Sequence, residues 1–334
     1  MNCGFFLDHV LRFTVMEKKL QDTNGSTGNL ISAILNEKAQ KHWYGTGKDS
    51  LMPSDDENTY VIKDESIELG RLILQDKLYT QAIGGLFPDI DLDGITRVLD
   101  IACGPAGWAI DVAFQFPEME VVGTDISESI INYNFAQARV RNLQNVTFEV
   151  MDVRKPFPFH DHSFDLVNGR LLIGFMDTDA WPQLLTECWR ILRPGGIIRL
   201  TESEIGISNS QAYQDILAYF CEALAKQKRT YSVDGRSLGI AYRLPRLLRE
   251  AGFQEIQSKA FSLDSSHSTP MHYPTFRNVE TAYVLLKPFI LQQVNVTEEE
   301  YDQRYNQMLT DIQKENFTCI SFGLTVWARK PEEA

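Results

Sequence analysis

The sequence predicts an α/β fold, with a mostly parallel sheet and helices on both of its faces. Three observations favour this fold: apolar stretches end repeatedly in an acidic residue, helical patterns separate those stretches, and a Pro-Gly-Gly turn leads from a helix into another apolar stretch. Strands that alternate with helices are typical of a parallel sheet. With 334 residues, 43% of them apolar, the chain is long enough for one large α/β core and a cap.

The glycine-containing loop after the first predicted strand is the most informative segment. The sequence from Arg97 to Trp108 is RVLDIACGPAGW, which places Asp100 near the end of the strand. Turns of this kind bind dinucleotides, phosphates or S-adenosylmethionine. The loop alone therefore does not decide between a dehydrogenase and a methyltransferase. Pro105 removes a backbone N–H that a pyrophosphate would use, and Asp100 attracts a cation. The loop therefore favours S-adenosylmethionine, which carries an ammonium and a sulfonium.

Two further predicted strands also end in an acid. Asp125 ends the strand at residues 120–125, and a carboxylate about 20 residues beyond such a loop can accept hydrogen bonds from ribose hydroxyls. The alternative is that Asp125 is the N-cap of the helix beginning near Ser127, and neighbouring residues of this region can also divide the two roles. Asp152 follows the third strand, where it can accept from an adenine amino group.

A fourth strand near residues 164–170 and a fifth after the turn at 194–196 complete an ordered set. With this set, residues 98–202 resemble the class I S-adenosylmethionine-dependent methyltransferases, in particular the small-molecule branch that includes ubiquinone and menaquinone biosynthesis enzymes. The resemblance implies a Rossmann-like, seven-stranded, mostly parallel sheet with an antiparallel C-terminal strand, helices on both faces and a helical cap. It also implies that S-adenosylmethionine is the cofactor.

The resemblance further assigns a cofactor site. The glycine loop shapes the methionine end, the second strand holds the ribose, the third flanks the adenine, and the fourth passes the cofactor's amino group. The chain has Ala102 and Ala106 where the family usually has glycine, which implies a slightly tighter pocket. The predicted cofactor-binding residues are Tyr60, Gln75, Asp100, Ala102, Cys103, Gly104, Asp125, Ile126, Asp152, Val153 and Asn168.

The chain divides into three predicted parts. Residues 1–28 form a flexible arm whose last part, 21–28, is polar and contains glycine. Residues 29–95 form a helical front cap, and 96–330 form the methyltransferase core. The core carries helical insertions at about 207–242 and 263–316. The second insertion is either a functional cover over the site or a packing or dimerisation element, and the sequence favours neither.

Methyl transfer depends mainly on alignment, which contributes roughly 7–11 kcal/mol, whereas a general base contributes about 10²–10⁴-fold. The candidate bases are Glu202 and Glu204, at the carboxyl edge of the sheet, and His267 and His272, in the second insertion. The alternative for each is structural hydrogen bonding. We expect no metal, because His160 and His162 lie in a loop without a third ligand nearby in sequence.

Composition limits the partners. The formal net charge of −13 disfavours nucleic acid, because a polyanion would be repelled. Five scattered cysteines and an N-terminus without a signal-peptide core predict a reducing cytoplasm and no membrane partner. The aromatic content favours a small apolar or aromatic substrate, which would be methylated on oxygen, nitrogen or carbon. The sequence leaves open whether the protein forms a homodimer. The competing hypotheses are an NAD(P)-dependent oxidoreductase and a noncatalytic cofactor-binding scaffold.

Overall fold

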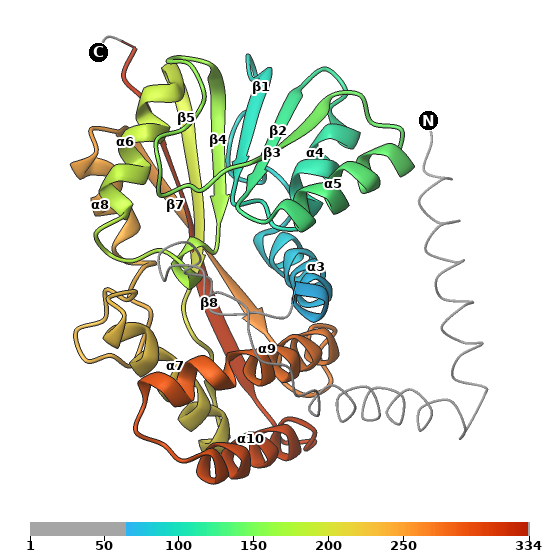
Figure 1. Cartoon of the computed structure of the whole chain (residues 1–334), viewed down its shortest axis with the longest axis vertical. Helices are drawn as coiled ribbons and strands as arrows, with labels where there is room; N and C mark the ends of the chain where they lie inside the picture. Colours follow the sequence, from blue (N-terminus) through green and yellow to red (C-terminus); the bar gives the residue numbers. More distant parts are fainter. Residues whose placement is uncertain (1–64, 333–334) are drawn as a thin grey trace, which may run out of the picture. The chain divides into compact units, whose positions relative to one another are not determined.

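The computed structural model describes residues 65–332 (Figure 1). The predicted arm at 1–28 and the candidate cofactor residue Tyr60 lie outside the described residues. The predicted front cap at 29–95 is described only from residue 65, where the helix α3 (Glu65–Ile83) begins. No helix among the residues described is long and apolar enough to cross a bilayer.

Eight strands of the described chain form one sheet in the order β3-β2-β1-β4-β5-β8-β6, with β7 also paired to β8. Strands β1 to β5 run parallel, and β8 runs antiparallel to β5, β6 and β7. The predicted fold class is confirmed, and the very short β6 is added to the seven strands expected. The strand bounds are β1 (Arg97–Ile101), β2 (Glu120–Asp125), β3 (Val146–Val150), β4 (Phe164–Arg170), β5 (Leu192–Ser203), β6 (Ile207–Ser208), β7 (Gln254–Asp264) and β8 (Cys319–Arg329).

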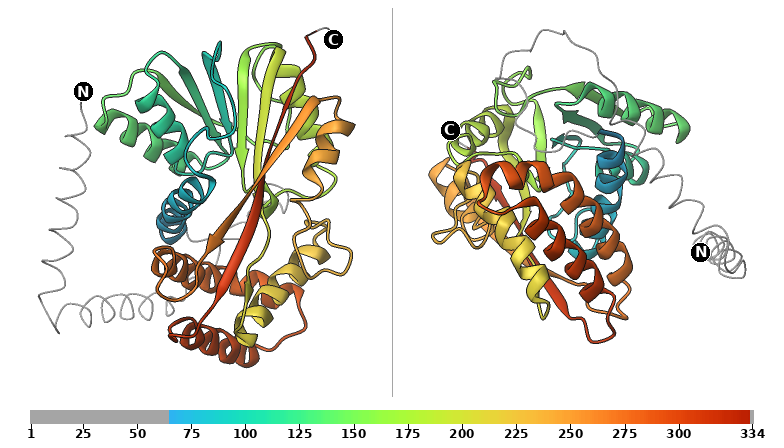
Figure 2. Two further views of the ribbon diagram at one scale, coloured as in Figure 1. Left: turned by 180° about the vertical axis from the view of Figure 1, so that it is seen from behind. Right: turned by 60° about the horizontal axis from the view of Figure 1, so that its bottom comes forward.

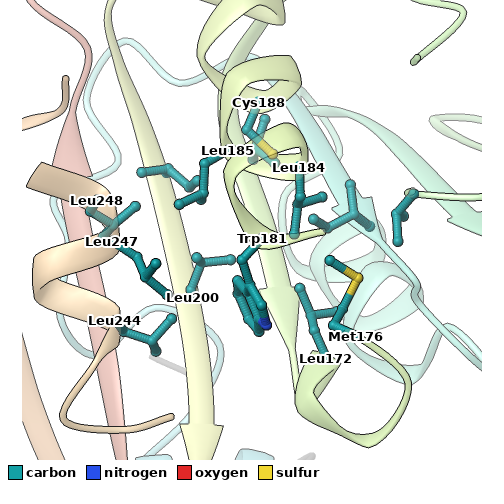
Figure 3. Packing of buried hydrophobic residues seen from close by; sticks show 14 of the residues in the cluster. Leu172, Met176, Trp181, Leu184, Leu185, Cys188, Leu200, Leu244, Leu247 and Leu248 are labelled. Atoms are coloured by element: carbon teal, nitrogen blue, oxygen red, sulfur yellow. The ribbon is translucent and has the colours of Figure 1, made fainter. Parts of the chain in front are cut away.

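Successive side chains of a strand point to opposite sides of the sheet. In the central strands both sets of side chains are buried, because helices cover both faces of the sheet. In β1, Val98 packs into the apolar cluster on one face and Leu99 into the cluster on the other. One cluster joins the sheet to α4 (Gly107–Gln115) and α5 (Glu128–Val140). The other joins it to the helices α6 (Trp181–Ile191) and α8 (Leu244–Glu250), around the fully buried Trp181 (Figure 3).

A helical cap lies at the end of the sheet toward which the parallel strands point, and β7 and β8 extend into it (Figures 1 and 2). Its helices share their own apolar cluster, and Tyr301 donates a 2.6 Å hydrogen bond from its hydroxyl to the carbonyl of Tyr283 within it. These helices come from the two segments in which insertions were predicted. They are α7 (Gln211–Lys226), α9 (His272–Gln293) and α10 (Glu298–Ile312).

Candidate active site

The glycine loop between β1 and α4 turns sharply at alternate residues. Ala102, Gly104 and Ala106 all have φ near +50°, in the left-handed region. That region costs a non-glycine residue roughly 1–2 kcal/mol. The two alanines therefore add a cost in backbone conformation, which the sequence did not predict; the tighter pocket expected from them stays a prediction. Cys103, between them, is buried and donates its backbone N–H to the carbonyl of Thr124, 2.7 Å away.

Asp125 joins this loop to the helix that follows β2. One carboxylate oxygen accepts from the backbone N–H of Gly104 at 2.9 Å, and the other accepts from the N–H of Ser127 at 3.0 Å. Burial raises the pKa of Asp125, while the backbone N–H groups partly lower it. Ser127 itself caps α5, accepting from the N–H of Ile130. The capping role considered for this region thus belongs to Ser127, and Asp125 remains beside the loop.

Asp100, near the end of β1, is 2% exposed and is the first member of a buried polar chain across three adjacent strands. Its Oδ1 accepts from the amide of Asn168 at 2.8 Å, and the amide oxygen of Asn168 accepts from Arg199 at 2.9 Å. Arg199 also forms an ion pair with Asp89 at 3.0 Å, in which both side chains are buried. Asn168 and Asp100, each predicted separately to contact the cofactor, are therefore hydrogen-bonded to each other.

The second carboxylate oxygen of Asp100, Oδ2, lacks within the described part of the chain a hydrogen-bond partner of the kind that Oδ1 has. It is buried, and no described residue donates a hydrogen bond to it. Burial raises the pKa of Asp100 to about 6, against the opposing effects of nearby Arg170, Asn168 and Arg199. A buried acceptor without a partner is costly, so this oxygen is suited to a cationic donor that arrives from outside the chain.

Asp152, which was predicted to accept from the adenine, has a partner within the chain that the sequence did not predict. Arg154 donates to Asp152 through its backbone N–H and its guanidinium, at distances from 2.7 to 3.0 Å. Although burial raises the pKa of Asp152, the hydrogen bonds and charge of Arg154 outweigh it and lower the pKa. Val153, predicted to flank the adenine, is buried, whereas Ile126, another predicted cofactor-binding residue, is 41% exposed.

Helix α3 brings charged groups to the end of β4 and to the start of α4. Gln75, a predicted contact residue, accepts from Arg71 of the same helix. Asp76 forms an ion pair with Arg170, the last residue of β4. Neither member of that pair was predicted. The available signal was the polar pair Asp76 and Thr80, which an i,i+4 spacing places on one face of α3.

Glu202 and Glu204, predicted as candidate bases, hold backbone segments in place. Glu202 accepts from the N–H groups of Leu172 and Ile173, at 2.6 and 3.4 Å, in the short 3₁₀ turn after β4. Glu204 accepts from three N–H groups in the segment 238–241, at 2.9–3.2 Å. Burial, opposed by the N–H groups and assisted by Glu204, raises the pKa of Glu202 to about 8.

The two candidate histidines lie in the cap. His267 and His272 contact each other edge to face with ring centroids 5.2 Å apart, and His272 borders a small cavity with Tyr213 and Phe317. His272 is paired with the carbonyl of Ser265, 3.0 Å from its Nδ1. Among the side chains that the structure describes, no cluster of three His, Cys, Asp or Glu residues is arranged to hold a metal ion.

Glu202→Gln tests the buried carboxyl. Because burial lifts the pKa of Glu202 to about 8 in the folded state, its contribution to stability is present at low pH and is lost as the pH rises through 8. We therefore expect the variant's free energy of unfolding, relative to the unaltered protein, to increase between about pH 5 and pH 8 and then level off. Urea denaturation of both proteins at each pH measures this difference, and a constant difference would contradict the assignment.

Comparison with known proteins identifies the family of this chain. Residues 98–196 match a family model described as a methyltransferase domain. The demethylmenaquinone methyltransferase of Geobacillus kaustophilus is 30% identical over 176 residues, which cover 50% of this chain and 74% of the relative. That of Anoxybacillus flavithermus is 28% identical over 192 residues, covering 54% and 80%.

Solved structures with a similar arrangement include phosphoethanolamine N-methyltransferase 2 of Haemonchus contortus in complex with S-adenosyl-L-methionine, with a TM-score of 0.48 and 19% identity over 84% of this chain and 61% of that one. A putative methyltransferase of Bacillus halodurans has a TM-score of 0.44 and 19% identity, over 77% and 98%. The family model and the curated relatives carry the conclusion. The chain belongs to the class I S-adenosylmethionine-dependent methyltransferases, and S-adenosylmethionine is its cofactor.

Proposed function

We propose that this protein transfers the methyl group of S-adenosylmethionine to a small apolar or aromatic metabolite. The observation that carries the proposal is the buried, unpartnered oxygen of Asp100 beside the glycine loop, described above. Asp100 would hold the ammonium at the methionine end of the cofactor, which would supply the missing donor and a compensating charge. The residues present therefore fit a cationic methyl donor better than a pyrophosphate, which would bring a second anion to Asp100.

The other predicted contacts fit the same orientation. Each carboxylate oxygen of Asp125 accepts one backbone N–H, and an ionised carboxylate offers about four acceptor sites, so lone pairs remain for ribose hydroxyls. Asp152 and Val153 follow β3 next along the sheet edge and would flank the adenine. Asn168 donates a hydrogen bond to Asp100 and would thereby orient the carboxylate that faces the amino group of the cofactor. In this arrangement the residues at the ends of β1, β2 and β3, which are neighbouring strands, would hold successive parts of the cofactor.

When bound, the cofactor supplies a methyl group already activated on a sulfonium. The chain's own residues then have to position the acceptor and exclude water, and good alignment provides much of the rate. Tyr79 of α3 makes one polar and one apolar contact beside the end of β5. Its hydroxyl lies 2.8 Å from the Oγ of Ser203 at the end of β5, and its ring contacts Phe261 edge to face. Such neighbours would suit an aromatic acceptor.

The curated relatives are named for demethylmenaquinone, and this supports an acceptor with an apolar, quinone-like ring. The general base remains a prediction for Glu202, Glu204, His267 and His272. The backbone hydrogen bonds of the two glutamates favour an anchoring role for them. An acidic ring hydroxyl or a ring carbon next to one would need little assistance from a base.

Asp125→Ala should weaken binding of S-adenosylhomocysteine by about tenfold or more, because it removes charge-assisted hydrogen bonds to the ribose. Isothermal titration calorimetry measures the dissociation constant, and circular dichroism verifies that the variant is folded. Asp111→Ala, on the exposed side of α4, is the matched control. An unchanged constant in Asp125→Ala would remove Asp125 from the site. Binding of NAD without S-adenosylhomocysteine would contradict the whole proposal.

Transfer of a radiolabelled methyl group to a panel of small acceptors tests the reaction itself. The panel should contain naphthoquinols, benzoquinols and simple phenols, each with and without an apolar side chain. We expect cofactor-dependent labelling of one or more ring acceptors and none of phosphoethanolamine. Tight binding of S-adenosylhomocysteine together with labelling of phosphoethanolamine alone would contradict the aromatic acceptor while leaving the cofactor site intact.

A further inference from the structure

One ion pair joins the front helix to the sheet beside the glycine loop. Arg170 ends β4 and pairs with Asp76 of α3, and the two side chains are only 12% and 14% exposed. Arg170 also donates to the hydroxyl of Thr80, 3.1 Å away, one helical turn after Asp76. Two residues on one face of α3 thus hold the guanidinium, which leaves this mostly buried cation paired within the chain.

The carboxylate of Asp76 lies directly against Gly107, the first residue of α4. A Cβ placed on Gly107 would lie 2.1 Å from Oδ2 of Asp76, so only glycine admits this approach. The cap residue Ala106 offers no side-chain hydrogen bond, and the first turn of α4 contains no acid. A helix N-terminus favours a negative charge beside it. Asp76, which lies against the first residue of α4 and pairs with Arg170, therefore occupies a position suited to an anion.

The same cluster includes the unpartnered acceptor. Arg170 lowers the pKa of Asp100 and Asp76 raises it, so the three charged groups lie within electrostatic reach of one another. The free oxygen of Asp100 is an acceptor for a cationic donor, and the position of Asp76 is an anion site. The methionine end of S-adenosylmethionine carries one group of each kind, an ammonium and a carboxylate.

We propose that Asp76 is an internal substitute for the cofactor's carboxylate, and that cofactor binding transfers Arg170 from Asp76 to that carboxylate. This inference rests on the proposed function and adds to it a residue that recognises the amino-acid end of the methyl donor. Without the cofactor, Asp76 satisfies a guanidinium that would be costly to leave unpaired. With the cofactor, a planar guanidinium can bind the incoming carboxylate with two parallel hydrogen bonds. Asp76 thus competes with the cofactor's carboxylate for Arg170, and Arg170 is the residue that binds the carboxylate.

The test compares two ligands that differ only in this carboxylate. Decarboxylated S-adenosylmethionine keeps the ammonium, the sulfonium and the adenosine. The quantity measured by calorimetry is the selectivity, defined as the affinity for S-adenosylmethionine divided by the affinity for its decarboxylated form. A variant that merely loses stability moves both affinities together, so the selectivity reports on the carboxylate contact alone.

We expect Arg170→Gln to lower the selectivity by about tenfold, because it removes a charge-assisted contact made only by the carboxylate. Arg170→Lys, which keeps the charge and loses the planar fork, should lower it less. Asp76→Asn should raise the selectivity, because it removes the competing anion. The matched controls are Arg141→Gln and Asp111→Asn, which break an exposed ion pair of 2.7 Å on α4 and should leave the selectivity unchanged.

Two results would overturn the inference. The first is an unchanged selectivity in folded Arg170→Gln, and the second is a lowered selectivity in Asp76→Asn, which would mean that Asp76 itself supports the cofactor. Both leave the proposed function intact, provided that the unaltered protein binds S-adenosylmethionine. Failure of the unaltered protein to bind either ligand would instead contradict the proposed function.

Discussion

The buried carboxylate of Asp100 at the end of β1 is the constraint on which the rest of the site depends. Removing an ionised carboxylate from water is expensive unless it is paired and hydrogen-bonded. Here one oxygen is held by Asn168, which is oriented by Arg199, which is balanced by Asp89. The other oxygen is left for a ligand. The hydrogen bond from Asn168 thus offsets part of the free energy lost when Asp100 is buried, and a bound cation would offset the rest.

The surrounding edge of the sheet is fixed by carboxylates that bind backbone N–H groups. Asp125 holds the glycine loop, Glu202 holds the turn after β4, and Glu204 holds the segment before α8. Parallel strands make this possible, because their carboxyl ends meet at one edge, where ligands of open α/β sheets bind. The loops that shape the site are therefore tied to strand ends instead of being left to their own conformational preferences. A pre-positioned site of this kind is what a reaction governed by alignment requires.

Much of this arrangement follows from local sequence. Strands that end in Asp100, Asp125 and Asp152, together with the glycine loop, predict the sheet and the edge where the acids gather. Partners far along the chain were not predictable, because no local pattern indicates that Arg199 reaches Asp89 or that Arg170 reaches Asp76. The acceptor roles of Glu202 and Glu204 were considered as the alternative to base catalysis, but their backbone partners were not predictable for the same reason, since strand-end acids anchor loops as readily as they bind ligands.

The most direct test of the central claim is the proton balance of cofactor binding at pH 6. With a pKa of about 6, Asp100 is half protonated there, and a cation placed against its free oxygen lowers that pKa. Titration of S-adenosylmethionine in two buffers of different ionisation enthalpy should show a fraction of a proton released by the unaltered protein and none by Asp100→Asn. Equal release by the two proteins would contradict the account.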